Sequence, residues 1–419
     1  MALSYEMLRD AVAGGAVGAT MKAALRPLGG AGDKVFPPTY AVDDKSKPQY
    51  AIETRRAGGQ SIASVALDSV GSQANRIETA LLEAVRDGSL RLPITSVDFR
   101  SHKDLADLDL LSELEAPHRI FDAILRDSMD ANGGAPVLFR LGAIGRAITE
   151  AAPRRATQLF VHSPVTLVLG GWDSTGPKGG RGAKYERALA SEITAYGIEL
   201  GAKTSSRIDP LGIELKGTVV YESTDAAEGW TLDPAAAVQE KGKPKQVRPS
   251  ETNHGNIAPS IDIRAGGVTA DAIRVSSVLS FIQLRRLKFP VDASGLPLAD
   301  RPAAELAART ALAAIGLAGV ILSVETGYDL RSRCVLVADG EPVLEMVGRT
   351  GSTTPFALSG TEATALVEEA AAAAAVGGLA WRAEELLLEP TPRLVELTRA
   401  SRRAATGAIT IDSSDTPED

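Results

Sequence analysis

The feature that most constrains this chain is an apolar run that breaks abruptly into a glycine-rich, basic stretch. Residues 165–169 form the run, and their β-branched content is typical of a buried strand. Six glycines fall between Gly170 and Gly182, so the backbone there can adopt positive φ and approach a ligand closely. Cations beside exposed backbone N–H groups favour a polyanion as ligand. A solvated surface loop is the alternative, and composition alone does not separate the two.

Two common phosphate-binding motifs are absent from this stretch. A P-loop needs a glycine five positions before a Gly-Lys-Ser/Thr triplet, but Gly182 is followed by Ala183 and position 177 is proline. The dinucleotide pattern G-x-G-x-x-G begins at Gly180 and fails at Tyr185. The stretch is therefore neither a mononucleotide nor a dinucleotide fingerprint.

Charge is unevenly distributed along the 419 residues, although the net charge is -8. Residues 241–290 contain nine Lys or Arg and three Asp or Glu, whereas the last fourteen residues contain four acids and no base. An acidic average therefore hides a basic segment, which suits a subunit that shares a nucleic acid with its neighbours. Residues 406–419 are acidic and poor in apolar side chains, which predicts a disordered tail.

Catalytic and membrane signatures are weak in the sequence. The four histidines (His102, His118, His162 and His254) lack the spacing of metal ligands, and no Gly-x-Ser-x-Gly elbow is present. We therefore expect no cofactor, no metal and no enzymatic activity. Cys334 is the only cysteine, which fits a reducing cytoplasm. The longest apolar candidate, residues 311–324, is shorter than the roughly 18 residues that a span needs, so we expect no membrane association.

The periodicity of the chain predicts an α+β fold, with a largely antiparallel sheet and helices inserted between strands. Expected helices cover residues 4–12, 117–125, 141–152, 303–317, 363–376 and 394–404, and a further amphipathic helix contains Ile77, Leu81 and Val85. Expected strands cover residues 21–28, 50–54, 94–100, 165–169, 193–200, 217–222, 320–324, 333–338 and 343–347. Residues 224–259 lack apolar periodicity and are expected to be a functional or disordered loop.

Four ordered segments carry a resemblance to a known family. They are residues 72–78 (SQANRIE), 171–193, with GWDSTG followed by KYER and SEI, 249–259 (PSETNHGNIAP), and 266–289, which opens with GGVT and ends with LRRLKF. Together they resemble the backbone subunit of the type I-G (formerly I-U) CRISPR effector complex, or Cascade, a member of the RAMP superfamily. The resemblance covers roughly residues 20–350.

This resemblance implies a single, hand-shaped RAMP-type domain over residues 1–405 with an RRM-like, ferredoxin-type core sheet and large insertions. Thumb or finger insertions are expected near residues 101–160 and 223–260. Copies of such a subunit oligomerise along the guide in a type I surveillance complex for antiviral defence, and the guide is displayed for pairing with target DNA. The implied partners are CRISPR RNA, target DNA, further copies of the chain, a fused fifth/sixth-type subunit, a large subunit and a helicase-nuclease.

The basic segments and the resemblance together select a set of candidate RNA-binding residues. They are Asn75, Arg76, Lys178, Arg181, Lys184, Arg187, His254, Asn256, Arg285, Arg286 and Lys288. Structural roles are open for several: capping or pairing for Asn75 and Arg76, and a tie across the long loop for His254 and Asn256. Trp172 is interpreted as a packing residue. Two other functions are also open, a RAMP-type ribonuclease and a structural interaction protein that binds no RNA.

Overall fold

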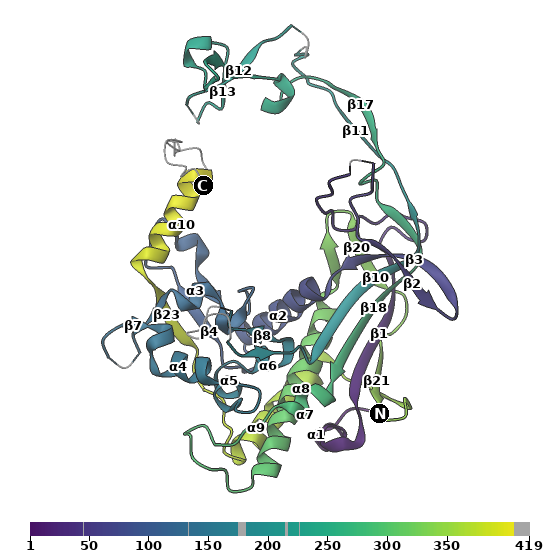
Figure 1. Ribbon diagram of the computed structural model, residues 1–419. Coiled ribbons are helices and arrows are strands. Elements are labelled where there is room, and N and C mark those ends of the chain that lie inside the picture. Colours follow the sequence, from purple (N-terminus) through teal and green to yellow (C-terminus); the bar gives the residue numbers. More distant parts are fainter. Residues whose placement is uncertain (45, 133, 175–181, 214–216, 226, 406–419) are drawn as a thin grey trace. The chain divides into compact units, whose positions relative to one another are not determined.

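The computed structural model describes residues 1–44, 46–132, 134–174, 182–213, 217–225 and 227–405 (Figure 1). These residues belong to two compact units. Unit 1 comprises Met1–Tyr40, Tyr50–Glu199 and Val268–Leu394, and unit 2 comprises Ala41–Gln49, Leu200–Gly267 and Val395–Asp419. The predicted single domain over residues 1–405 stays a prediction, as does the disordered tail at 406–419, which lies outside the described residues.

A nine-stranded sheet forms the centre of unit 1. Along its main path the strands are β19 (Tyr328–Arg331), β20 (Cys334–Ala338), β1 (Gly18–Pro27), β18 (Val268–Ser280), β10 (Leu189–Leu200), β3 (Gln60–Asp68) and β2 (Ile52–Ala57). Off this path, β21 (Val343–Val347) pairs with β1 and with β22 (Thr353–Phe356). The β1–β18 and β1–β20 pairs, which hold the middle of the sheet, are antiparallel.

Helices cover one face of this sheet. Residues of β1 alternate, and Ala19, Met21, Ala23 and Leu25 are the buried set. Their face lies toward α2 (Val70–Arg86) and α8 (Arg301–Thr326), which contact each other, and α8 also contacts α9 (Gly360–Val376) (Figure 1). The period-2 burial of the strand thus matches a sheet with one covered face and one open face.

The middle of helix α8, residues 310–321, is mostly apolar and is buried on all sides. Among the described helices it alone is long and apolar enough to cross a membrane. However, 78% of its most apolar window is buried inside the protein, so length and composition are weak evidence for a membrane span.

A smaller sheet and several short helices complete unit 1. The sheet contains β5 (Leu110–Ser112), β4 (Thr95–Asp98), β23 (Leu386–Pro390), β6 (Ser128–Asp130) and β7 (Val137–Leu138). The helices are α1 (Tyr5–Asp10), α3 (Ala123–Arg126), α4 (Ala143–Glu150), α5 (Thr157–His162), α6 (Pro164–Leu169) and α7 (Phe281–Arg286). Helix α10 (Pro392–Ala405) ends the described chain, and from Val395 on it belongs to unit 2.

Unit 2 is built from short antiparallel strands. A ribbon pairs β11 (Lys203–Arg207) with β17 (Ile257–Asp262), and a second small sheet orders β13 (Trp230–Thr231), β12 (Val220–Glu222) and β16 (Gln246–Val247). A third pair joins β14 (Gln239–Glu240) to β15 (Lys243–Pro244). Residues 224–259, for which no regular pattern was expected, therefore contain several two-residue strands. The expected insertions near 101–160 and 223–260 fall in unit 1 and unit 2, respectively.

The predicted α+β class is confirmed, but three predicted elements are wrong. Residues 165–169, expected as a strand, belong to helix α6, which begins at Pro164 and is buried on every side. Residues 320–324, also expected as a strand, form part of α8. Residues 165–169 are fully buried and residues 320–324 are buried or half-buried, and in such mostly apolar segments periodicity cannot separate helix from strand. The helix expected at 117–125 is divided into a 3₁₀ turn, Arg119–Phe121, and α3.

Candidate nucleic-acid interface

The glycine-rich stretch begins and ends in a short hairpin. Strands β8 (Gly171–Trp172) and β9 (Lys184–Tyr185) pair so that Gly171 lies opposite Tyr185 and Trp172 opposite Lys184. The Asp173 N–H donates to the Ala183 carbonyl at 3.2 Å. Residues 175–181, with the candidates Lys178 and Arg181, lie outside the described residues.

Two glycines of this hairpin are required for packing. A Cβ on Gly171 would lie 2.6 Å from the Thr166 side chain, and one on Gly182 would lie 1.9 Å from the Asp173 carbonyl oxygen. Both distances are too short for any side chain. At these two positions glycine therefore allows two parts of the protein to pack closely together. The sequence had suggested instead that the glycines allow the close approach of a ligand.

Two arginines fix the ends of the hairpin. Arg119 donates through Nη2 to Glu78 Oε2 and through Nη1 to the Gly170 carbonyl, both at 3.0 Å, and this pair is almost fully buried. Burial raises the pKa of Glu78, and the positive charge of Arg119 acts in the opposite direction. Arg140 Nη2 meets Asp173 Oδ1 at 2.8 Å, and the Asp173 side chain is also buried. Charge-assisted hydrogen bonds therefore hold the hairpin to other parts of unit 1.

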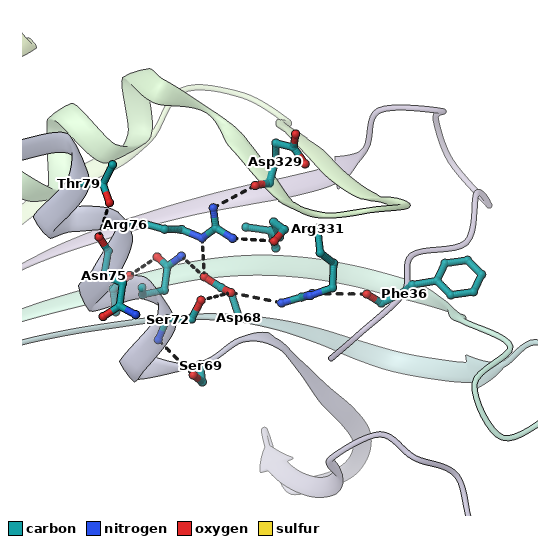
Figure 2. Close-up of polar contacts among 12 residues, drawn as sticks. Phe36, Asp68, Ser69, Ser72, Asn75, Arg76, Thr79, Asp329 and Arg331 are labelled. Atoms are coloured by element: carbon teal, nitrogen blue, oxygen red, sulfur yellow. Dashed lines mark hydrogen bonds and ion pairs between the residues drawn. The ribbon is translucent and has the colours of Figure 1, made fainter. Parts of the chain in front are cut away.

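The candidate Arg76 makes structural contacts, and whether it also contacts RNA stays a prediction. Its Nε donates to Asp68 Oδ2 at 2.9 Å, and its Nη1 and Nη2 donate to the carbonyls of Asp329 and Leu330 at 3.0 and 2.8 Å (Figure 2). These bonds connect the start of α2 to the ends of β3 and β19. Its neighbour Asn75 is exposed on α2, where its carbonyl accepts from the Thr79 hydroxyl.

Asp68 is the centre of the network that holds Arg76. Its side chain is fully buried, and it accepts from Ser72 Oγ and Gln73 Nε2 at 2.7 Å and from Arg331 Nη2 at 3.4 Å (Figure 2). Gln73 Oε1 in turn accepts from Ser191 Oγ at 2.9 Å. The segment 72–78, which carried part of the resemblance, thus contributes side chains to a buried network that ties α2 to three strands.

Arg285 and Arg286 are adjacent in the sequence but have different surroundings. Arg285 donates to the Val12 carbonyl at 2.7 Å, to that of Ala11 at 2.9 Å and to that of Ala16, so it caps the turn after α1. Arg286 is exposed and pairs with the equally exposed Glu186 at 2.8 Å. Lys288 lies 3.7 Å from the buried Glu305. Arg285 therefore stabilises the fold, whereas Arg286 is accessible.

The structure brings Lys184 and Arg286 together at one pocket of about 180 Å³ in unit 1. Its described lining residues are Pro153, Leu167, Lys184, Tyr185, Glu186, Ala188, Gln283, Arg286 and Leu287. Lys288 joins the same region, because its N–H donates to the Pro153 carbonyl at 2.8 Å. Glu186 is the one carboxylate among these lining residues.

Two further cations follow Pro153 directly. Arg154 and Arg155 are exposed, and the Ala156 N–H donates to the Lys288 carbonyl at 2.8 Å, which holds this segment beside Lys288. We call Arg154, Arg155, Lys184, Arg286 and Lys288 the basic rim. Sequence reasoning missed the first two, although an Arg-Arg doublet after a proline is a visible signal. Five cations from three segments make this a candidate site for a polyanion.

The other candidate residues have structural contacts. Arg187 is exposed at the end of the hairpin and donates to the Val70 carbonyl at 3.1 Å. In unit 2, Asn256 Oδ1 accepts from the Asp209 N–H at 2.7 Å, and the His254 carbonyl accepts from Arg207 Nη2 at 2.6 Å. The last two residues thus hold the loop before β17. Whether any of them contacts RNA stays a prediction.

The open face of the large sheet carries an aromatic site that the sequence analysis missed. Two guanidinium groups lie near the Tyr196 ring on β10, that of Arg274 at 5.5 Å and that of Arg55 at 5.9 Å from its centroid. Tyr196 and Arg274 line a groove of about 540 Å³ together with Lys22. The groove also contains Glu192, Asp339 and Glu341, so its charge is mixed. The alternation of polar residues along β10 and β18 was the signal that could have located it.

Within the described parts of the chain, no group of three or more His, Cys, Asp or Glu side chains is placed to hold a metal ion. Cys334 is buried, and burial raises the pKa of its thiol. The expected absence of a cofactor and of enzymatic activity stays a prediction.

Comparison with known proteins gives one informative match. Residues 20–200 match the family model described as CRISPR-associated protein GSU0053 (Cas_GSU0053). Over this range, which is a little under half of its length, the chain is similar to a CRISPR-associated family. No curated protein matches the chain.

Solved structures also give matches, one of which is the crystal structure of Thermofilum pendens Csc2. The two chains are 12% identical, and the match covers 95% of this chain and 80% of that chain with a TM-score of 0.25. A likeness at this TM-score carries no argument about fold or function.

Proposed function

We propose that this chain is an RNA-binding backbone subunit of a type I-G CRISPR effector complex. The similarity of residues 20–200 to a CRISPR-associated family carries the proposal. This range contains β1, α2, the hairpin β8–β9 and β10, which are central parts of unit 1. The four sequence segments that resemble the I-G backbone subunit agree with it and supply the subtype.

We infer an RRM-like core from the order of the strands. Strands β20, β1, β18 and β10 adjoin in that order, with α2 between β1 and β10 in the chain and α8 between β18 and β20. This is the arrangement of a βαββαβ unit with spatial strand order 4-1-3-2. In this interpretation β2–β3, the segment 101–160 and residues 200–267 are insertions into the core.

The basic rim supports binding of the guide through its phosphates. Two of its cations, Lys184 and Arg286, line the same pocket as one exposed carboxylate, Glu186, which is paired with Arg286. Contacts of this kind are independent of sequence, so each copy of the subunit can hold a different part of the guide. The target is then selected by base pairing and not by the protein.

The same function defines the expected partners and location. Copies of the chain line up along the CRISPR RNA in the cytoplasm, beside the fused fifth/sixth-type subunit, the large subunit and the helicase-nuclease, and the guide pairs with target DNA. The subunit itself has no catalytic role. A RAMP-type ribonuclease is the principal alternative, and a structural protein without RNA is the other.

The proposal is tested with purified protein and fluorescent single-stranded RNA of mixed sequence. We expect binding by anisotropy, and a clear loss of affinity in the variant Arg154→Ala/Arg155→Ala. The control variant is Arg91→Ala/Lys103→Ala, which removes the same number of exposed cations outside the rim and should bind as the wild type does. Absence of RNA binding by the wild type would exclude the proposal. Metal-dependent cleavage of the RNA by this chain would favour the ribonuclease instead.

A further inference from the structure

Trp172 is a large aromatic residue that the fold leaves accessible. The chain has three tryptophans, and the side chain of this one is 47% exposed on β8. By contrast, its neighbours in the hairpin, Asp173 and Tyr185, are buried. The interpretation of Trp172 as a packing residue is therefore wrong for much of its surface. A single exposed apolar side chain needs no explanation by itself, but this one lies next to the basic rim.

Lys184 of the basic rim stands directly opposite Trp172. The two residues are partners in the β8–β9 register, and side chains of such a pair share one face of the ribbon, with Cβ atoms about 4.5–5.5 Å apart. Lys184 is exposed as well, and it shares a pocket with Arg286. An accessible indole thus stands beside one cation of the rim, Lys184, which shares a pocket with a second, Arg286.

The hairpin that carries Trp172 is held firmly. Gly170, the residue before β8, is bonded to the buried Arg119, and Asp173, directly after Trp172, is bonded to Arg140 and to the Ala183 carbonyl. Close packing at Gly171 and Gly182 restricts the same segment. A preorganised aromatic group loses little conformational freedom when a ligand stacks on it, so more of the contact energy is retained as affinity.

We propose that Trp172 stacks against an unpaired base of single-stranded RNA while Lys184 and Arg286 contact the adjoining phosphates. The inference rests on the proposed function and adds to it a base contact on this hairpin. Every base has a π-face, so the contact discriminates little between sequences. Base–aromatic stacking usually contributes about 5- to 150-fold in affinity per base, and we expect a contribution of this size from Trp172.

The test compares Trp172→Ala, Trp172→Tyr and the wild type for binding to a short RNA and to the same RNA with abasic sites. We expect Trp172→Ala to weaken binding of the intact RNA about tenfold, Trp172→Tyr to retain most of the affinity, and the abasic RNA to bind all three proteins alike. Tyr40→Ala is the matched control, since Tyr40 is a similarly exposed aromatic residue of unit 1 that lies outside the basic rim. We expect it to bind as the wild type does.

A second measurement guards against a misfolded variant. Irradiation of wild-type protein bound to RNA containing 5-iodouridine should crosslink the RNA to the peptide that contains Trp172. If the wild type binds RNA but Trp172→Ala binds equally well and no such crosslink forms, the stacking inference is wrong and the proposed function stands. If the wild type binds no RNA, both are wrong.

Discussion

The network around Asp68 and the basic rim both contain arginines or lysines. In the network the cations are bonded to acceptors inside the protein, whereas in the rim most of them remain accessible. In the network, Arg76 and Arg331 approach one fully buried carboxylate, and Arg76 donates in addition to two backbone carbonyls (Figure 2). In the rim, Lys184 and Arg286 share a pocket with one carboxylate, Glu186, and Arg154 and Arg155 are exposed. A guanidinium whose donors are already engaged has few left for phosphate, whereas an exposed one retains them.

The comparison shows that the acceptors around a cation, more than its presence in the sequence, decide what it can bind. Arg285 and Arg286 demonstrate this within two consecutive residues, because one donates to three carbonyls and the other pairs at the surface. The same division predicts which substitutions should unfold the protein and which should weaken RNA binding.

The largest effect is expected where a buried charge loses its partner. Arg119→Ala leaves Glu78 buried without its counter-charge and the Gly170 carbonyl without its donor. We expect a loss of about 3–5 kcal/mol in the free energy of unfolding, measured by urea denaturation. Arg91→Ala, at an exposed position, is the control and should cost less than about 0.5 kcal/mol. Equal stability of the two variants would mean that the buried pair does not hold the hairpin.

Neutralising a buried carboxyl whose charge is poorly compensated should stabilise the protein instead. Glu113 is fully buried, and burial raises its pKa to about 8 despite the opposing charge of Arg382. Between its ordinary pKa of 4.5 and about 8, the folded state retains the proton that the unfolded state releases, so stability falls as pH rises. We expect Glu113→Gln to be more stable than the wild type by about 3 kcal/mol at pH 7. Thermal unfolding from about pH 4.5 to pH 8 checks this, and a constant difference across that range would contradict it.

The adjacent arginines give the direct test of the comparison. Arg285→Ala removes three hydrogen bonds to carbonyls and should cost about 2 kcal/mol in the free energy of unfolding, with little change in RNA affinity of the remaining folded protein. Arg286→Ala should cost less than about 0.5 kcal/mol but weaken RNA binding. Denaturation and anisotropy on both variants separate the two roles. If both substitutions act alike, the division between structural and binding cations fails.

Much of the fold could be predicted from the sequence because its patterns are local. Alternation predicted a strand at residues 94–100, where β4 covers Thr95–Asp98, and the apolar spacing of Ile77, Leu81 and Val85 predicted α2. The pattern failed at α6 and near the end of α8, where extensive burial weakens the periodicity that distinguishes a helix from a strand. Tertiary packing decides whether such segments form a helix or a strand.

The site was less predictable, because it depends on which distant segments meet. The sequence identified Lys184, Arg286 and Lys288 as candidates, and the structure places them in one region. The sequence could not show that Arg76 and Arg285 would donate to acceptors inside the protein, since those acceptors come from residues far away in the chain. Nor could it show that Trp172 would be accessible, because an indole is usually buried at least in part.

The smallest effect concerns the salt dependence of RNA binding at the rim. The variant Lys184→Ala/Arg286→Ala removes two exposed cations and should leave the thermal midpoint nearly unchanged. If each cation neutralises one phosphate of single-stranded RNA, the slope of log affinity against log salt should become shallower by about 1.4. Between about 50 and 200 mM salt the wild type should then lose about sevenfold more affinity than the variant. The pair Arg91→Ala/Lys103→Ala, which removes equal charge elsewhere, should keep the wild-type slope. An identical slope in all three proteins would show that the rim cations, though accessible, do not contact the RNA. The difference between the rim and the Asp68 network would then concern only the stability of the fold.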